Sequence, residues 1–186
     1  SYQIVLQNNQ PVNENIELTS VADMPAKTGL GSSGAYLVGL LTAIRTYKRE
    51  TATVAEIAEE ACRIEMDILK EPVGKQDQYM AAFGGFRTLD ISREGKVSVG
   101  AVPVDSMLVN ELSTKARMYY TGVQRSATAV LRQQDAAARE KGSPDHARVV
   151  DSLLKIKDLG VRIKKTFEDR DLDAFGRMMD EHWMFK

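Results

Sequence analysis

A glycine-rich run directly before a long apolar segment is the feature that most restricts the folds open to this chain. The run, PAKTGLGSSGAYLVGLLTAI, occupies residues 25–44 and places three glycines within six positions. After it, apolar residues recur at helical spacing with hardly a charge before Arg45, which predicts a largely enclosed helix that begins in GSSGA. The fold must therefore deliver a glycine turn to the N-terminus of a buried helix.

Such a turn is chemically able to hold an anion. Glycine has no Cβ to keep backbone amides away from a ligand, and a helix N-terminus adds free N–H groups and a positive dipole end. Serine hydroxyls can bond a phosphate oxygen or a magnesium ion. The candidate phosphate-binding residues are Gly29, Leu30, Gly31, Ser32, Ser33 and Gly34. The run has neither the Gly-Lys-Ser/Thr ending of a Walker loop nor the spacing of a dinucleotide fingerprint, so the loop alone leaves a plain structural turn equally open.

The first part of the chain alternates between strand and helix patterns. Residues 1–6 and 15–22 alternate apolar and polar side chains, which predicts two strands. Thr53 and Glu56 form a capping-box pattern at the start of a second helix, which Pro72 should end. Two short strands are predicted in FRTLDI and KVSVGAV, which lie between residues 86 and 102.

The pattern changes in the third quarter of the chain. SMLVNEL and RMYYTG, in residues 106–122, are strand candidates, and helices are predicted near 123–140, 144–169 and 172–185. We therefore expect two domains, at residues 1–104 and 105–186.

Composition excludes several classes of partner. The 25 basic and 26 acidic residues are dispersed and nearly balanced, so no global field favours nucleic acid or an anionic membrane. No apolar stretch is long enough to span a membrane, and the single cysteine, Cys62, lies at an apolar helical position. We expect a cytoplasmic protein with a buried thiol, and a chain truncated at both ends because Ser1 already lies inside a strand pattern.

Two carboxylates follow the glycine loop at places where chemistry could use them. Glu65 lies on the second predicted helix, and Asp77 follows Pro72 and Gly74 in KQDQY. One acid with a serine hydroxyl would suffice for magnesium, and a second acid could accept a proton from a hydroxyl nucleophile. Each acid taken singly would more commonly be a solvated surface group.

The loop and the two acids together resemble a known family. PAKTGLGSSGAYLVGLL is similar to the second motif of the GHMP kinases, P-x-G-x-G-L-G-S-S-A, and the resemblance extends through EMDILKEPVGKQDQYMAAFGGF, YYTGVQRSA and DEHW to one branch, the D-glycero-D-manno-heptose 7-phosphate kinases. The resemblance implies an α+β fold, with an S5-like N-terminal domain and part of a ferredoxin-like C-terminal domain. It covers almost the whole chain.

The resemblance also implies a role for each candidate residue. The loop would wrap the phosphates of ATP, Ser33 and Glu65 would bind Mg²⁺, and Asp77 would orient or deprotonate the attacking sugar hydroxyl. The residues that match the family segment near the substrate are Thr121, Gly122 and Arg125. Arginine suits a phosphate because its guanidinium can bind two oxygens at once.

The chain departs from the family pattern at two positions. Lys27 stands where the family has glycine, and Gly34 stands where it has alanine, which lowers helix propensity at the first turn. The first and third family motifs should lie before Ser1 and after Lys186, so this chain by itself could be inactive.

These implications lead to one expected function and several alternatives. We expect an ATP-dependent kinase that phosphorylates the anomeric (C1) hydroxyl of D-glycero-D-manno-heptose 7-phosphate, in nucleotide-activated heptose biosynthesis. Another GHMP sugar-1-kinase, of the galactokinase, fucokinase or N-acetylhexosamine kinase type, stays open. So do a non-catalytic nucleotide or sugar sensor and a structural interaction domain. The partner would be a small sugar or sugar phosphate, without nucleic acid or membrane, and a homodimer stays open.

Overall fold

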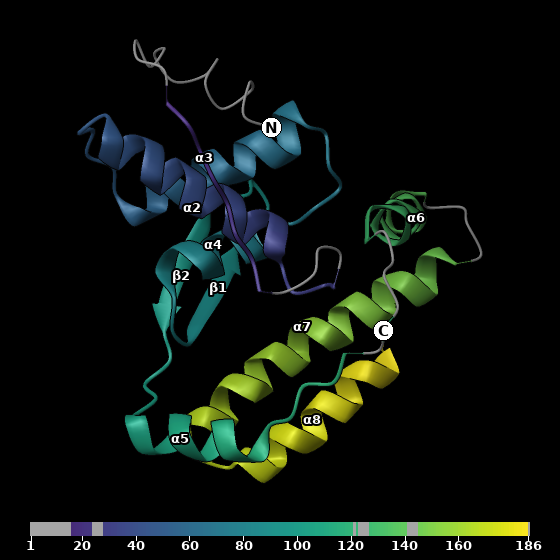
Figure 1. The fold of residues 1–186 in the computed structure, drawn as a ribbon. Coiled ribbons are helices and arrows are strands. Elements are labelled where there is room, and N and C mark those ends of the chain that lie inside the picture. The colour runs from purple at the N-terminus through teal and green to yellow at the C-terminus, as the bar shows by residue number, and fades with distance from the viewer. Residues whose placement is uncertain (1–15, 24–27, 121, 123–126, 141–144, 186) are drawn as a thin grey trace. The chain divides into compact units, whose positions relative to one another are not determined.

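The computed structural model of this chain describes residues 16–23, 28–120, 122, 127–140 and 145–185. Within these residues the backbone forms a set of helices and one two-stranded antiparallel sheet, as an α+β fold requires (Figure 1). The chain divides into two compact units, the first from residues 1–85 and 120–131 and the second from residues 86–119 and 132–186. Each unit has its own packing and is described separately.

The first unit is centred on helix α2, Ser32–Tyr47, which begins inside the glycine run as predicted. Its apolar face is buried, and Leu41 and Ile44 are 0% and 2% exposed. This face packs with Ala61 and Ile64 in one hydrophobic cluster. The burial of a continuous apolar face fixes the axis of α2, and with it the direction in which its N-terminus points.

Helix α3, Val54–Arg63, follows with the predicted capping box. The Thr53 hydroxyl accepts from the Glu56 amide at 3.2 Å, and the Glu56 carboxylate accepts from the Thr53 amide at 2.7 Å. The helix continues into one π-helical segment, η1, Ile64–Ile68, and Cys62 is buried as expected. Helix α4, Gln76–Phe83, completes this layer and packs against both α2 and α3 (Figure 1).

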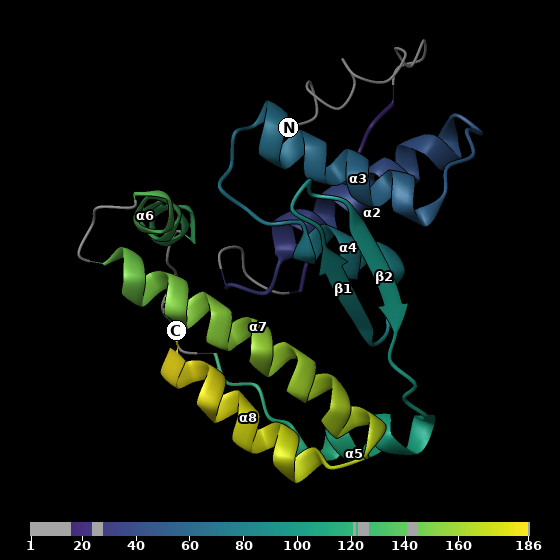
Figure 2. The ribbon, with the colours of Figure 1, turned by 180° about the vertical axis from the view of Figure 1, so that it is seen from behind.

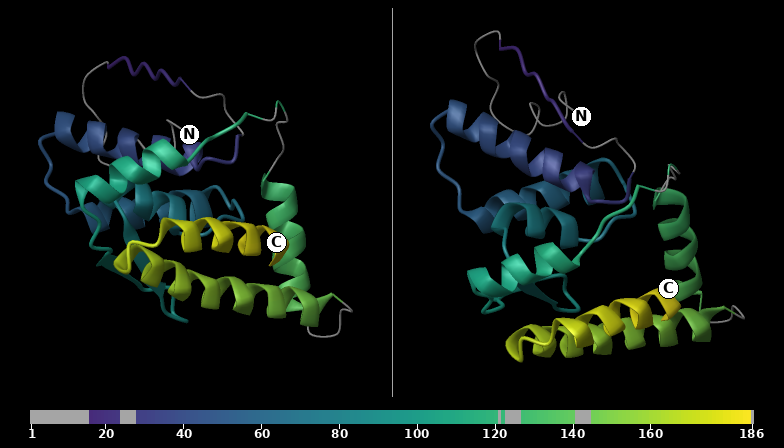
Figure 3. Two further views of the ribbon diagram at one scale, coloured as in Figure 1. Left: turned by 90° about the horizontal axis from the view of Figure 1, so that it is seen from below. Right: turned by 60° about the horizontal axis from the view of Figure 1, so that its bottom comes forward.

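The second unit begins with a β-hairpin. Strands β1, Arg87–Ile91, and β2, Val97–Ala101, pair in antiparallel register from Arg87 opposite Ala101 to Ile91 opposite Val97, which confirms the two predicted strands. Helices α7, His146–Glu168, and α8, Leu172–Phe185, lie side by side and run in opposite directions (Figures 2 and 3). Helix α6, Ala127–Arg139, contains the point where the chain passes between the units.

A small aromatic core holds the second unit together. Phe167 packs against Phe86 and Phe175 with ring centroids 5.2 and 4.9 Å apart. Leu108 and Leu172 are buried in the same cluster, which joins the hairpin, the α7–α8 pair and helix α5, Ser106–Lys115. Helices α6, α7 and α8 confirm the helices predicted near 123–140, 144–169 and 172–185, with bounds close to those expected.

Three strand predictions are wrong for residues that the structure describes. SMLVNEL is helix α5, Ser106–Lys115, and residues 116–120 have no regular structure. The Asp105 carboxylate caps α5 by accepting a hydrogen bond from the Leu108 amide at 2.9 Å, and this cap stabilises the start of a helix. Residues 16–22 also show no strand, and the other strand predicted in this part of the chain, residues 1–6, lies outside the described residues. A strand needs a neighbour to supply its hydrogen bonds, so alternation alone was insufficient.

Candidate functional site

The glycine loop ends in a backbone conformation that leaves the start of α2 open. Gly31 has φ +68° and precedes the first helical residue, Ser32, without any side-chain cap. Gly29 also has positive φ, +81°, and Leu30 between them is 53% exposed. The first backbone N–H groups of α2 therefore lack a capping side chain, as an anion-binding helix N-terminus requires.

A buried carboxylate lies against this helix start. Ser33 Oγ donates a hydrogen bond to Glu65 Oε1, and Gln78 Nε2 donates to Glu65 Oε2. Glu65 is only 3% exposed, whereas most helical glutamates are solvated. The π-helical segment η1 carries Glu65, and such segments occur frequently at functional sites. Glu65 is therefore held from two sides, by one residue of α2 and one of α4.

Asp77 lies directly against two glycines of the loop. A Cβ atom built on Gly31 would lie 2.9 Å from Asp77 Cγ and 3.0 Å from Oδ2. A Cβ on Gly34 would lie 3.2 Å from both Asp77 Cβ and the Gln78 amide nitrogen. The two glycines thus let α4 approach α2 closely, and the departure at Gly34 has a structural reason. Asp77 itself is solvent-exposed, so its carboxylate is accessible.

A second polar cluster fixes the start of α4. Lys75 Nζ donates to both oxygens of Glu59, at 2.9 and 2.8 Å, and the Tyr79 hydroxyl donates to Glu59 Oε1. Glu59 belongs to α3, whereas Lys75 and Tyr79 flank Asp77 and Gln78 in the chain. The cluster therefore holds the two site residues of α4 in place against α3.

The electrostatics of this cluster agree with its geometry. Burial acts to raise the pKa of Glu59, but the hydrogen bonds from Lys75 and Tyr79 and the lysine charge outweigh it and lower the pKa. Burial is the main cause that raises the pKa of Tyr79, and its hydrogen bond to Glu59 raises it further, so the hydroxyl remains a donor. Burial also raises the pKa of the neighbouring Cys62 thiol to about 12, which makes a structural role fit this cysteine.

The structure brings together most of the residues predicted from the sequence. The loop, Ser33, Glu65 and Asp77 meet at the N-terminus of α2, although 32 positions separate Ser33 from Glu65 in the chain. Gly122 is described, exposed and in the left-handed region at φ +75°. Thr121, Arg125 and Lys27 lie outside the described residues.

Sequence reasoning missed Gln78 and the cluster around Glu59. Gln78 is 1% exposed, but a glutamine beside an aspartate gives no periodic signal of burial. Glu59 and Lys75 are sixteen positions apart, and the sequence offers no spacing rule for such a pair. These contacts depend on how α3 and α4 pack.

The donor set at the helix start fits a hard cation that also binds a substrate. Ser33 and Glu65 supply oxygen ligands only, which suits magnesium. Among the described residues, no cluster of three or more histidine, cysteine, aspartate or glutamate side chains could hold a metal by itself. A magnesium ion bound here would therefore need phosphate oxygens and water as further ligands, which is its usual manner of binding in nucleotide sites.

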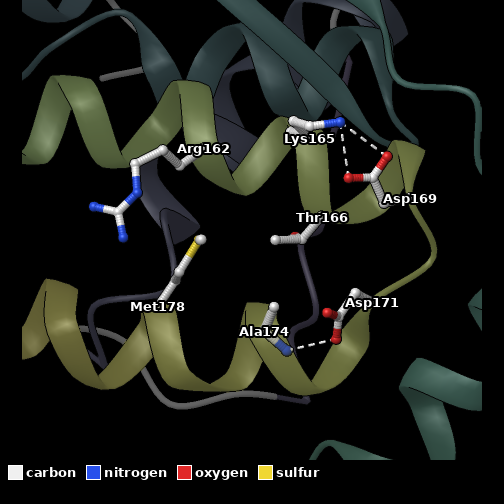
Figure 4. Close-up of a pocket in the computed structure, with 7 residues that line it drawn as sticks. All are labelled: Arg162, Lys165, Thr166, Asp169, Asp171, Ala174 and Met178. Atoms are coloured by element: carbon white, nitrogen blue, oxygen red, sulfur yellow. Dashed lines mark hydrogen bonds and ion pairs between the residues drawn. The ribbon is translucent and has the colours of Figure 1, made fainter.

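A shallow pocket elsewhere has a different character. It lies between α7 and α8 and has a volume of about 260 Å³ (Figure 4). Its charged side chains already have partners: Lys165 pairs with Asp169 at 2.8 Å, Arg162 pairs with Glu181 at 2.7 Å, and the Asp171 carboxylate accepts from the Ala174 amide at 2.8 Å. The lining contains none of the predicted site residues.

Of the helices that the structure describes, none is both long and apolar enough to cross a membrane.

Comparison with known proteins shows which family this chain is similar to. Residues 2–85 match the model of the GHMP kinases N terminal domain, a range that contains the loop, Glu65 and Asp77. Over 172 residues the chain is 26% identical to a D-glycero-alpha-D-manno-heptose 7-phosphate kinase of Campylobacter jejuni, covering 92% of this chain and 49% of the relative. The chain therefore spans about half the length of that relative.

Two solved structures share the fold. A D-glycero-D-manno-heptose 1-phosphate kinase of Bacteroides thetaiotaomicron matches with a TM-score of 0.73 and 24% identity, over 99% of this chain and 52% of that one. A Campylobacter jejuni protein described as a sugar kinase matches with a TM-score of 0.64 and 25% identity, over 87% and 43% of the two chains. Residues 2–85 of this chain are thus similar in sequence to the N-terminal domain of the GHMP kinases.

Proposed function

We propose that the full-length protein is an ATP- and magnesium-dependent kinase that phosphorylates the anomeric (C1) hydroxyl of D-glycero-D-manno-heptose 7-phosphate. The observation that carries this proposal is the meeting of Ser33, Glu65 and Asp77 at an uncapped helix N-terminus inside a GHMP kinase domain. The names of two relatives supply the substrate class. The reaction would belong to nucleotide-activated heptose biosynthesis, in the cytoplasm.

Each part of the site has one task in this proposal. The amides of Gly29–Gly34 and the start of α2 bind the phosphates of ATP. Ser33 and Glu65 would hold Mg²⁺, which would supply positive charge against the phosphates. Asp77 orients the sugar hydroxyl and accepts its proton. The hydroxyl oxygen forms a bond to the γ-phosphorus, and the bond between that phosphorus and the leaving oxygen of ADP breaks.

The remaining candidates act on the sugar. Thr121, Gly122 and Arg125 would contact the substrate, and the Arg125 guanidinium would pair with the phosphate that the sugar already carries.

We further propose the domain boundary at residues 104 and 105. A domain on each side is consistent with phosphoryl transfer, in which the protein mainly positions the reactants and stabilises charge.

The test is a substrate panel with the full-length protein. The two heptose kinase relatives are named for different positions of the phosphate, so the panel should hold heptose 7-phosphate, heptose 1-phosphate, free heptose, galactose, fucose and N-acetylhexosamines. Phosphorus NMR of the product identifies the hydroxyl that is phosphorylated. We expect a new phosphate on C1 of the 7-phosphate. Turnover of galactose, fucose or an N-acetylhexosamine alone would replace the proposed substrate by that sugar, and ATP binding without any turnover would indicate a sensor.

A further inference from the structure

Gln78 is a buried polar residue whose amide is only half used. Its side chain is 1% exposed, and Nε2 donates to Glu65 Oε2. Among the described residues, Oε1 has no hydrogen-bond partner although it is also buried. A buried acceptor without a donor reduces stability, so packing alone gives no reason for a glutamine at this position.

The orientation of the Gln78 amide follows from its neighbour. Only the NH₂ end of an amide can donate a hydrogen bond, and Nε2 is the atom that lies against Glu65 Oε2. Ser33 occupies the other oxygen, Oε1, from the N-terminal turn of α2. The two oxygens of Glu65 therefore have separate surroundings, one facing the glycine loop and one facing α4.

The backbone supports the same division. Glu65 lies in the π-helical segment η1, where the Leu69 amide donates to the Ile64 carbonyl at 2.9 Å and the Glu71 amide to the Glu65 carbonyl at 2.9 Å. Ile64 is 2% exposed in the core beneath α2, so two consecutive residues of this segment are buried. The backbone of Glu65 is thus held in the core, and Gln78 holds one carboxylate oxygen on the side of α4 while the other faces Ser33.

We propose that Gln78 is a positioning residue: its hydrogen bond occupies Oε2 of Glu65, so that Glu65 binds a divalent cation through one oxygen only. The inference rests on the proposed function, in which Ser33 and Glu65 hold the divalent cation that accompanies ATP. Magnesium requires compact octahedral geometry, whereas calcium takes more oxygens and often uses both oxygens of one carboxylate. By keeping Oε2 occupied, Gln78 favours magnesium over calcium.

The experiment measures cation preference by binding. The full-length protein is titrated calorimetrically with a non-hydrolysable ATP analogue, once in saturating Mg²⁺ and once in saturating Ca²⁺, and the ratio of the two dissociation constants is the readout. Gln78→Met removes both polar atoms at similar size, and Gln76→Met, on the exposed first residue of α4, is the matched control. We expect the preference for magnesium to fall about 10-fold in Gln78→Met and to stay unchanged in Gln76→Met.

The outcomes separate this inference from the proposed function. An unchanged ratio in folded Gln78→Met would overturn the positioning role while leaving the kinase proposal intact. If the parent protein binds the analogue equally with and without a divalent cation, the Ser33 and Glu65 assignment fails, and this inference fails with it. Should circular dichroism show that Gln78→Met is unfolded, Gln78→Asn, whose amide is one methylene short of Glu65, decides by the same ratio.

Discussion

At the scale of single residues, the site is defined by one buried carboxylate. Glu65 is 3% exposed, and its two oxygens accept hydrogen bonds from Ser33 and Gln78. Neither of these two donors carries a positive charge. Burying a charged group is costly unless it is hydrogen-bonded, and a site that binds a cation gives a reason to maintain it. A solvated helical glutamate would need none of these contacts.

Replacing this carboxylate should change the magnesium requirement first. In Glu65→Gln, one oxygen ligand becomes a weaker amide ligand, so the Mg²⁺ concentration for half-maximal turnover should rise by at least about 10-fold. Initial rates of ATP consumption over a magnesium titration measure this. Glu94→Gln, at an exposed acid of the hairpin turn, is the control. A magnesium titration that superimposes on the parent's would remove Glu65 from the metal ligands.

At the scale of elements, the site depends on how closely α4 approaches the start of α2. Two glycines of the loop permit this approach, and the cluster of Glu59, Lys75 and Tyr79 holds α4 against α3. Asp77 and Gln78 are consecutive on α4 but serve different neighbours, one beside Gly31 and the other beside Glu65. A small shift of this one helix would therefore disturb both contacts together.

A methyl group at Gly31 should disturb Asp77 directly. Gly31→Ala places Cβ 2.9 Å from Asp77 Cγ and also strains a residue at φ +68°. The strain alone costs about 1–2 kcal/mol. Gly95→Ala is the matched control, because Gly95 has φ +80° with nothing within 4 Å of its Cβ position. Both variants should lose thermal stability, but only Gly31→Ala should lose kcat; equal kcat in the two variants would show that the Asp77 contact is unimportant.

The Glu59 cluster should make part of the stability depend on pH. The pKa of Glu59 is lowered from 4.5 in the folded protein, so its contribution is fully present above pH 4.5 and is lost as pH falls through the lower folded value. Its side chain is 46% exposed, so we expect Glu59→Gln to cost only about 1 kcal/mol at pH 7. Urea unfolding at pH 7 and pH 3 should show the difference from the parent shrinking in acid. A difference that is the same at both pH values would contradict this role.

At the scale of the whole molecule, the chain consists of two units and spans about half the length of its curated relative. The first unit contains the loop, Glu65 and Asp77, and the second has its own aromatic core around Phe167. The two units therefore have separate sources of stability, and the described part of the candidate site belongs to the first.

The sequence predicted the parts of this molecule that depend on local patterns. Helix α2, the capping box of Thr53, the β-hairpin and helices α7 and α8 all follow from periodicity and end signals. Helix α5 differs from the strand predicted there, because the cap at Asp105 stabilises the helical start more than the apolar residues of this run favour a strand. At the site, the loop, Glu65 and Asp77 were identified by motif, whereas the contacts of Gln78 and Glu59 required the packing of α3 and α4.

Asp77→Asn in the full-length protein tests directly whether Asp77 acts in phosphoryl transfer. Turnover of heptose 7-phosphate and the dissociation constant of ATP with Mg²⁺ are measured on the same preparations, with Asp90→Asn, at an exposed acid of β1, as the control. Removing a general base typically costs about 10²–10⁴-fold, so we predict a loss of kcat in that range with ATP affinity retained. Undiminished turnover in Asp77→Asn would contradict the claim that the loop, Glu65 and Asp77 form one phosphoryl-transfer site.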